Sequence, residues 1–147
     1  MKNITSQSST ALLEGAITWT NGEQFRAVGP SGHALVMDGD RERNTGPGPM
    51  ELLLLALGGC TGADVVTILR KKRQALTALE IRVEGERAPE PPTVWTRLKV
   101  HYRLVGKGLD PKAVAHALEL SRTKYCSVAA TLGRTAQIDW SHTIEEP

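Results

Sequence analysis

The stretch that decides the fold is residues 49–73, PMELLLLALGGCTGADVVTILRKKR. Most of its residues are good helix formers and few are β-branched, and Pro49 suits the first turn of a helix. The second half has an acidic residue near its start and a basic cluster at its end, which matches a helix dipole. The sequence therefore predicts one helix from about Pro49 and another over residues 63–73, interrupted by Gly58-Gly59.

The part of the chain before this stretch predicts a small sheet. Residues 12–20, 25–28 and 33–37 are typical of short strands, and Asn21-Gly22 is a strong signal for a tight turn between the first two. These strands are expected to form an antiparallel meander. Residues 38–49, which are rich in charge, Gly and Pro, are expected to form a loop.

The part after the stretch alternates strand and helix patterns. Residues 79–86 and 94–104 alternate apolar and charged side chains, as half-buried strands do. Asp110-Pro111 predicts a helix start, Cys126 follows that helix, and residues 136–144 predict a last strand. The order of elements indicates an α+β fold with antiparallel sheet rather than a βαβ repeat.

Composition narrows the class of protein. The chain has 147 residues, which suits a single domain over 1–147, with the polar residues 1–10 as a flexible terminus. A net charge of +2 argues against nucleic-acid binding. The N-terminus has no secretory pattern, and the apolar run at Leu52–Leu57 is far below the roughly 20 residues that span a bilayer. We therefore expect a cytoplasmic protein that is not associated with a membrane. The very apolar residues 50–69 favour a homodimer, because such a helix needs cover on nearly every side.

Two cysteines are the candidates for chemistry. Structural disulfides are rare in the cytoplasm, so Cys60 and Cys126 are either buried small apolar residues or working thiols. Cys60 is expected at the start of the second helix, where the dipole favours a thiolate. The two cysteines are 126 − 60 = 66 residues apart, which fits neither a Cys-x-x-Cys motif nor a zinc pattern. The residues alone leave both alternatives open for each cysteine.

The remaining polar residues give weaker signals. Glu51 is the one charge inside the apolar stretch, and it either orients a group near Cys60 or complements the helix dipole in the first turn. The four histidines are scattered along the chain, and no phosphate-binding loop or nucleophile elbow is present. The sequence therefore predicts neither a metal site nor a cofactor.

Several segments together resemble the OsmC/Ohr family, most closely its YhfA-like branch. The segments that carry the resemblance are Pro49–Leu53, Ala56–Cys60, Asp64–Leu69 and Ser121–Val128, with smaller matches at residues 31–33 and 37–38. The resemblance runs from about Ile17 to the C-terminus. It implies an intertwined homodimer in which two antiparallel sheets wrap long central helices.

The resemblance also implies chemistry. In the peroxidase members of the family, the thiolate of the first cysteine attacks a peroxide and becomes a sulfenic acid, which the second cysteine converts to a disulfide. A dithiol reductant, of the lipoyl type in the best-known members, then reduces this disulfide. By motif, Cys60 would be the peroxidatic thiol and Cys126 the resolving thiol, in a protein that defends against oxidative stress.

The chain departs from the family pattern at two places. Peroxidase members have an acidic residue where this chain has Met50, so only the following position, Glu51, is acidic. The arginine of Ohr-type members lies in the first hairpin turn, where this chain has Gly22-Glu23. In OsmC-type members it lies in the later loop, where Arg41 and Arg43 are candidate substitutes. Glu51 and Arg41 are therefore predicted as supporting residues.

Two functions from different classes follow. The first is a thiol-dependent peroxidase that reduces organic or hydrogen peroxides through Cys60 and Cys126. The alternative is a non-enzymatic protein that binds a small apolar or sulfur-containing ligand in a pocket near Cys60. A purely structural role for both cysteines is the third possibility, and it predicts thiols that are inert in the native state.

Overall fold

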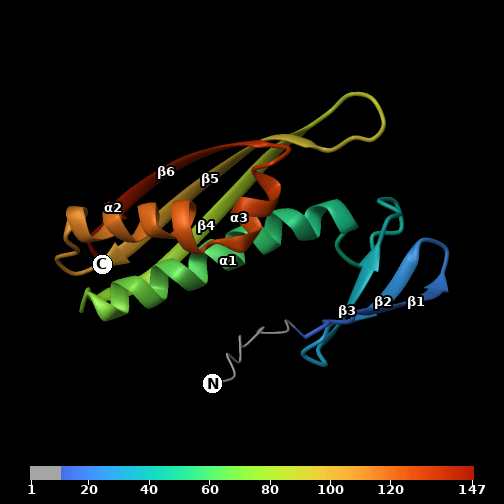
Figure 1. Cartoon of the computed structure of the whole chain (residues 1–147), viewed down its shortest axis with the longest axis horizontal. Helices are drawn as coiled ribbons and strands as arrows, with labels where there is room; N and C mark the ends of the chain where they lie inside the picture. Colours follow the sequence, from blue (N-terminus) through green and yellow to red (C-terminus); the bar gives the residue numbers. More distant parts are fainter. Residues whose placement is uncertain (1–10) are drawn as a thin grey trace, which may run out of the picture. The chain divides into compact units, whose positions relative to one another are not determined.

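The computed structural model describes residues 11–147, and the chain divides into two compact units, Met1–Pro49 and Met50–Pro147. Figure 1 shows the elements of both units in chain colours. The predicted flexible terminus at residues 1–10 lies outside the described residues, and a single domain over 1–147 stays a prediction.

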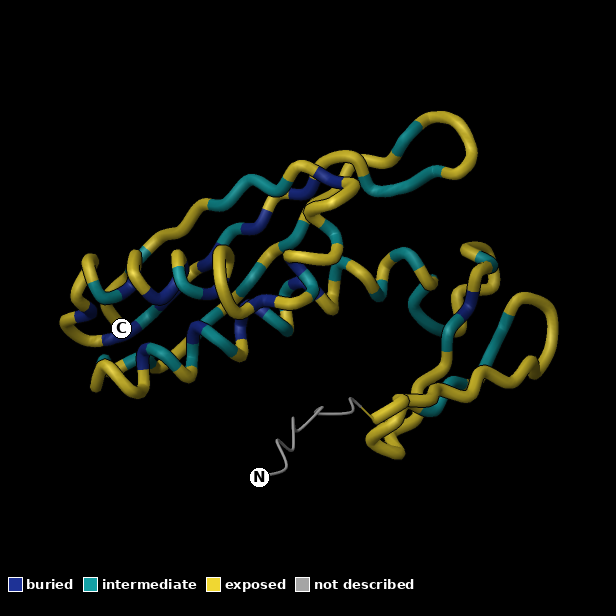
Figure 2. The backbone as a smooth tube through the Cα atoms, viewed as in Figure 1, coloured by how far each residue is buried: buried dark blue, intermediate teal, exposed yellow. Residues whose placement is uncertain are grey.

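The first unit contains a three-stranded antiparallel sheet in the order β1-β2-β3. Its strands are β1 (Ala16–Asn21), β2 (Gln24–Val28) and β3 (Ala34–Asp38), each within a few residues of its predicted range. Gly22 has a φ of +52° in the turn between β1 and β2, a conformation that glycine adopts without strain. Within these strands only Asp38 is buried, and Figure 2 shows the strands mostly in the colour of exposed residues.

The loop predicted after β3 is held by the carboxylate of Asp38. Its Oδ1 accepts a hydrogen bond from the Asp40 backbone N–H at 2.9 Å, and its Oδ2 accepts one from the Thr45 hydroxyl. The Thr45 hydroxyl and the Asp40 N–H lower the pKa of Asp38, because both hydrogen bonds favour its charged form. The charged, Gly- and Pro-rich loop is therefore tied back to the end of its own strand.

The second unit begins with a long helix and ends with a strand. Its elements are α1 (Pro49–Lys71), β4 (Leu76–Arg87), β5 (Trp95–Gly106), α2 (Pro111–Leu120), a π-helical turn η1 (Ser121–Tyr125), α3 (Ser127–Leu132) and β6 (Gln137–Glu145). The predicted N-cap is present at the start of α2, where Asp110 Oδ1 accepts a hydrogen bond from the Lys112 N–H at 3.0 Å.

The second sheet has the order β4-β5-β6 and is mixed rather than antiparallel. β4 and β5 form the predicted antiparallel hairpin, but β6 runs parallel to β5, with Val100 opposite Trp140. The prediction of purely antiparallel sheet was wrong here, because apolar alternation marks a strand and not its direction. The helices between β5 and β6 carry the chain back to the same end of the sheet, as a parallel pair requires. The α+β class itself is confirmed.

One face of this sheet supports the helices. Along β5 the buried side chains alternate with exposed ones, and Tyr102 lies among them. The fully buried aliphatic residues of the unit include Leu57, Val65, Leu69, Leu98, Val100, Leu104, Val114 and Ala117. Each such side chain contributes roughly 1.5–3 kcal/mol of transfer free energy, so this layer between the sheet and the helices is the core.

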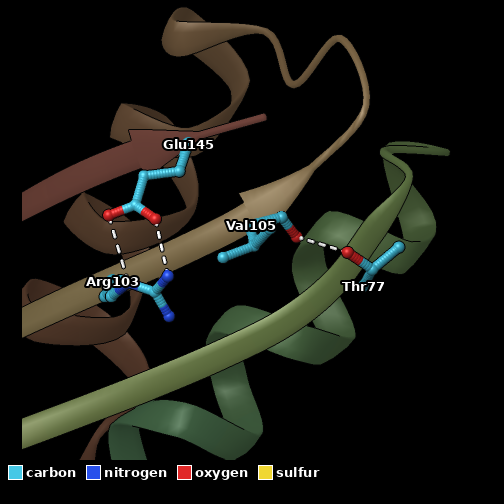
Figure 3. A network of polar contacts seen from close by, with 4 residues as sticks. All are labelled: Thr77, Arg103, Val105 and Glu145. Carbon is cyan, nitrogen blue, oxygen red and sulfur yellow. Dashed lines mark hydrogen bonds and ion pairs between the residues drawn. The ribbon is translucent and has the colours of Figure 1, made fainter. Parts of the chain in front are cut away.

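The other face of the sheet is charged. Arg103 Nη2 lies 2.6 Å from Glu145 Oε2, and Arg97 Nη2 lies 2.9 Å from Asp139 Oδ2. Figure 3 shows the first pair beside the hydrogen bond of 3.1 Å from the Thr77 hydroxyl to the Val105 carbonyl. The alternation predicted from the sequence therefore separates an apolar face from a solvated one.

Helix α1 is continuous, so the predicted interruption at Gly58-Gly59 was wrong. The glycines do not break the helix; they leave room for β4 side chains on its surface. A Cβ on Gly62 would lie 2.9 Å from Ile81 Cδ1, and one on Gly58 would lie 3.4 Å from Val83 Cγ2. These glycines let α1 approach β4 closely, and the packing offsets the low helix propensity of glycine.

Among the described residues, α1 is also the one helix that is long and apolar enough to span a membrane by length and composition. The same helix carries Leu57, Val65 and Leu69 into the core of the second unit, so its apolar character is partly explained by packing.

Candidate functional site

Cys60 lies in the middle of α1, on a half-buried part of its surface. The prediction that it begins a helix was wrong, because the helix runs unbroken through Gly58-Gly59. Cys60 therefore does not lie at the N-terminus of its own helix. A Cβ on Gly59 would meet no atom within 4 Å, so the chain leaves open space next to this cysteine.

Cys126 lies between η1 and α3 and is buried, with 4% of its surface exposed. Its backbone N–H donates to the Ser121 carbonyl at 2.8 Å, and its Sγ accepts a hydrogen bond from the Ala129 N–H at 3.3 Å. These bonds make Cys126 the N-cap of α3. The prediction that Cys126 follows one helix and precedes another is correct.

The structure brings the two thiols together from positions far apart in the sequence. Both cysteines are free, and Cys60 packs against the core cluster that contains Cys126. Burial raises the pKa of the Cys126 thiol to about 11, and its hydrogen bond with the Cys60 thiol acts in the same direction. The buried thiol is therefore held in its neutral form, while the half-buried one lies within hydrogen-bonding reach of it.

A chain of buried hydroxyl groups lies beside the thiols. The Thr61 hydroxyl is 2.6 Å from the Tyr102 hydroxyl and 2.8 Å from Ser121 Oγ. Ser121 Oγ in turn donates to Asp64 Oδ2 at 2.9 Å. Burial raises the pKa of Tyr102 to about 12, so its phenol stays protonated. Three elements, α1, β5 and η1, are joined by this network.

Sequence reasoning did not identify this network. Thr61 and Asp64 lie within four residues of Cys60 in the sequence, and that nearness was the one signal available. Ser121 was noted as the first residue of the second-cysteine segment of the resemblance, and Tyr102 as part of a strand, but neither was predicted to bond near Cys60. Their partners are 41 to 60 positions away along the chain, so the fold alone brings them together.

Asp64 also opens onto a groove of about 550 Å³ in the second unit. Ile68, Leu120 and Tyr125 give the groove an apolar wall, while Lys71, Lys72 and His116 add basic groups. Helical periodicity places Cys60, Asp64, Ile68 and Lys71 along one side of α1. The groove therefore runs along the side of α1 that carries the thiol.

Glu51 lies in the first turn of α1 and is exposed. Nine residues separate it from Cys60, which is two and a half turns of a continuous helix, so the two side chains leave α1 on opposite sides. Glu51 lines a separate groove of about 360 Å³ with Gly58, Gly59 and Ile81. Within one chain, α1 therefore does not bring Glu51 to the thiols.

Arg41 and Arg43 both belong to the first unit, in the turns after β3. Arg41 is exposed. Arg43 reaches back to the turn between β1 and β2, where its Nη1 lies 3.0 Å from the position of a Cβ on Gly22. Of the two candidate arginines, Arg43 thus occupies the hairpin turn itself.

The described residues contain no group of three or more His, Cys, Asp or Glu side chains that could hold a metal ion. The candidate site is instead a pair of free thiols, one half-buried on a central helix and one buried at a helix junction, in an α+β fold. These features define a two-thiol protein whose helices cover one face of a mixed sheet.

Comparison with known proteins identifies the family. The model for OsmC-like proteins matches residues 39–141, and this chain belongs to that family. It is 38% identical to Protein YhfA of Escherichia coli strain K12 over 132 residues, which cover 90% of this chain and 98% of YhfA. The resemblance inferred from the cysteine segments is therefore confirmed.

Solved structures agree with this assignment. A hypothetical protein from Aquifex aeolicus superimposes with a TM-score of 0.84 at 30% identity, covering 94% of this chain and 99% of its own. The organic hydroperoxide resistance protein OhrB of Bacillus subtilis superimposes with a TM-score of 0.61 at 13% identity, covering 90% and 98%. The second likeness shows a shared fold.

Proposed function

We propose that this protein is a thiol-dependent peroxidase that reduces organic or hydrogen peroxides through Cys60 and Cys126. The observation that carries the proposal is the pair of free thiols within hydrogen-bonding reach of each other. The family supports it, because structural relatives include a protein of organic hydroperoxide resistance.

The different surroundings of the two thiols support different roles. Cys60 is half-buried and has open space beside it, whereas Cys126 is buried with its thiol pKa raised to about 11. The Cys60 thiolate attacks the peroxide, the O–O bond breaks, and the leaving oxygen takes a proton and departs as alcohol or water. Cys60 is then a sulfenic acid, and Cys126 condenses with it to a disulfide and water. A dithiol reductant of the lipoyl type returns both thiols by exchange.

We further propose that the protein is a cytoplasmic homodimer. Trp19 is 65% exposed on β1 and Leu55 is 64% exposed on α1, although both are large apolar side chains. Exposed apolar surface of this kind marks an interface, and a second copy of the chain would cover it. The family resemblance supports this assembly.

Glu51 and Arg41 stay predicted supporting residues for peroxide binding. The nearness of Arg43 to the Gly22 turn makes Arg43 the alternative guanidinium. Comparing the peroxidase rates of Arg41→Ala and Arg43→Ala would assign the role to one of them.

The proposal is tested by counting thiols after adding cumene hydroperoxide to the reduced protein. Wild type is expected to lose both thiols at one equivalent of peroxide, and to regain them with a dithiol. Cys60→Ser is expected to abolish turnover, whereas Cys126→Ser should accumulate a sulfenic acid that dimedone traps. Persistence of both thiols in the wild type at stoichiometric peroxide would refute the proposal.

The groove along α1 supports the second candidate function, a binding protein for a small apolar or sulfur-containing ligand. Its apolar wall of Ile68, Leu120 and Tyr125 lies on the side of α1 that carries Cys60. This alternative predicts saturable ligand binding that survives Cys60→Ser and is not accompanied by peroxide consumption.

A further inference from the structure

We propose that Asp64 accepts the proton of the Cys126 thiol when the disulfide between Cys60 and Cys126 closes. This role rests on the proposed two-thiol chemistry and adds a step to it. The buried hydroxyl groups of Ser121, Thr61 and Tyr102 hold the carboxylate in position for that transfer.

The fold places Asp64 one helical turn from Cys60 and links it to Cys126 through Ser121. It follows Cys60 by four residues on a continuous helix, so the two side chains lie one turn apart on the same side of α1. Ser121 connects it to the second cysteine, since its Oγ donates to Asp64 Oδ2 at 2.9 Å and its carbonyl accepts from the Cys126 N–H at 2.8 Å. Burial raises the pKa of Cys126 most, and the negative charge of Asp64 adds a smaller effect in the same direction.

A proton acceptor near Cys126 would accelerate disulfide closure. A thiol with a pKa of about 11 is ionised at roughly one part in 10⁴ at pH 7, and only the thiolate attacks sulfur. If a carboxylate takes the proton as the S–S bond forms, the reaction no longer depends on the small thiolate fraction of Cys126.

The other groups that face Cys126 cannot take this role. Tyr102 on β5 has a pKa of about 12 and stays protonated, and Arg122 on η1, which faces Tyr102, has no acceptor. Cys60 on α1 is the sulfur under attack, and α3, whose sequence is SVAATL, carries no titratable side chain. Asp64 is the carboxylate that remains among the described residues. It is half-buried, and the groove with Lys71, Lys72 and His116 connects it to water.

The Cys126 S–H bond breaks and its proton moves to the Asp64 carboxylate, while the Cys126 sulfur attacks the sulfur of the Cys60 sulfenic acid. The S–O bond breaks, and the leaving hydroxide takes the proton from Asp64 and departs as water. The Cys126 sulfur is oxidised and the Cys60 sulfur is reduced to the disulfide level, and Asp64 is restored.

The test uses 5,5′-dithiobis(2-nitrobenzoate), so that it does not depend on peroxide. The Cys60 thiolate releases one nitrothiolate and forms a mixed disulfide, and Cys126 then displaces a second nitrothiolate in a phase independent of reagent concentration. In Asp64→Asn this second phase is expected to be about 100-fold slower at pH 7, the low end of what a general base contributes. Its rate should then rise roughly tenfold per pH unit and reach the wild-type pH 7 rate at about pH 9, because hydroxide replaces the carboxylate.

Two variants separate this role from a structural one. Asp64→Glu keeps a carboxylate and should restore most of the rate at pH 7. Asp139→Asn removes a carboxylate from the outer face of β6 and should leave both phases unchanged. A purely structural defect would slow Asp64→Asn equally at every pH. That result, or an equal or faster second phase at pH 7, would overturn the proposal.

The same experiment distinguishes failure of the peroxidase function from failure of the proton-transfer role. If peroxide leaves the thiols intact but the two nitrothiolate phases respond to Asp64→Asn as expected, only the peroxidase function is refuted. If peroxide is reduced but Asp64→Asn leaves the rate of the second phase unchanged, only the role of Asp64 is refuted. If neither cysteine of the native protein reacts with the reagent, both are refuted.

Discussion

The two sheets of this chain each contain three strands, but they bury very different surfaces. In β4-β5-β6 one face is lined by fully buried side chains such as Leu98 and Leu104. In β1-β2-β3 the buried residue is Asp38, while Ile17 and Trp19 are 59% and 65% exposed. The first sheet therefore presents apolar side chains that a single chain leaves uncovered, whereas the second has a core of its own.

This difference teaches that strand pattern and burial are separate properties. Both sheets were predicted from apolar and β-branched residues, and both formed. Whether such a sheet is stabilised by its own chain depends on what packs against it, and only the second sheet has α1 as cover within its own unit. A second copy of the chain is the cover that we propose for the first.

The largest expected effect comes from the same truncation in the two sheets. Leu104→Ala on β5 should lower the free energy of unfolding by about 2–5 kcal/mol, because Leu104 is fully buried and a cavity remains. Leu35→Ala on β3 is the matched control, and since Leu35 is 44% exposed it should cost less than about 1 kcal/mol in dilute protein. Urea unfolding measures both, and equal losses would contradict the comparison.

A smaller effect is expected on association. Trp19→Ser should weaken self-association by roughly 2 kcal/mol, or about 30-fold, because it removes a large aromatic side chain from the proposed interface. Thr18→Ser is the control, since neighbouring residues of a strand face opposite sides. Sedimentation velocity over a dilution series measures the dissociation constant of the dimer. An unaltered constant would show that β1 is not part of the interface.

The smallest effect is expected on the outer face of the second sheet. Arg103→Ala breaks the pair with Glu145, whose side chains are 46% and 43% exposed, and should cost only about 0–1 kcal/mol. The loss should shrink further in 1 M salt, because exposed charges are screened. If Arg103→Ala lowers the free energy of unfolding as much as Leu104→Ala does, the charged face of the sheet contributes as much stability as the apolar face, and the comparison fails.

The elements were largely predictable from sequence, and the errors have identifiable causes. The apolar residues after Pro49 predicted a helix correctly, but Gly58-Gly59 was read as a break because glycine disfavours helices by about 1 kcal/mol per residue. Close packing of Gly58 and Gly62 on β4 outweighs that cost. The direction of β6 was missed because alternation is the same in parallel and antiparallel pairs.

The candidate site was only half predictable. Cys60 and Cys126 were candidates from composition alone and took their roles from the family resemblance, but no local rule showed that their thiols meet. The carboxylate of Asp64 became a candidate only when its bond to Ser121 was seen, across 57 positions of sequence. Glu51 was predicted either to support the site or to complement the helix dipole; within one chain the unbroken helix places it on the other side of α1, and its supporting role stays a prediction.

The sequence by itself determined the α+β class, the family and the two cysteines, because propensity, alternation and motif residues are local properties of the chain. The tertiary structure decided that the two thiols are neighbours, that Cys126 rather than Cys60 caps a helix, and that a carboxylate and three hydroxyl groups lie beside them. These are contacts between distant segments. They depend on how α1, β5 and η1 pack, and no single segment encodes that packing.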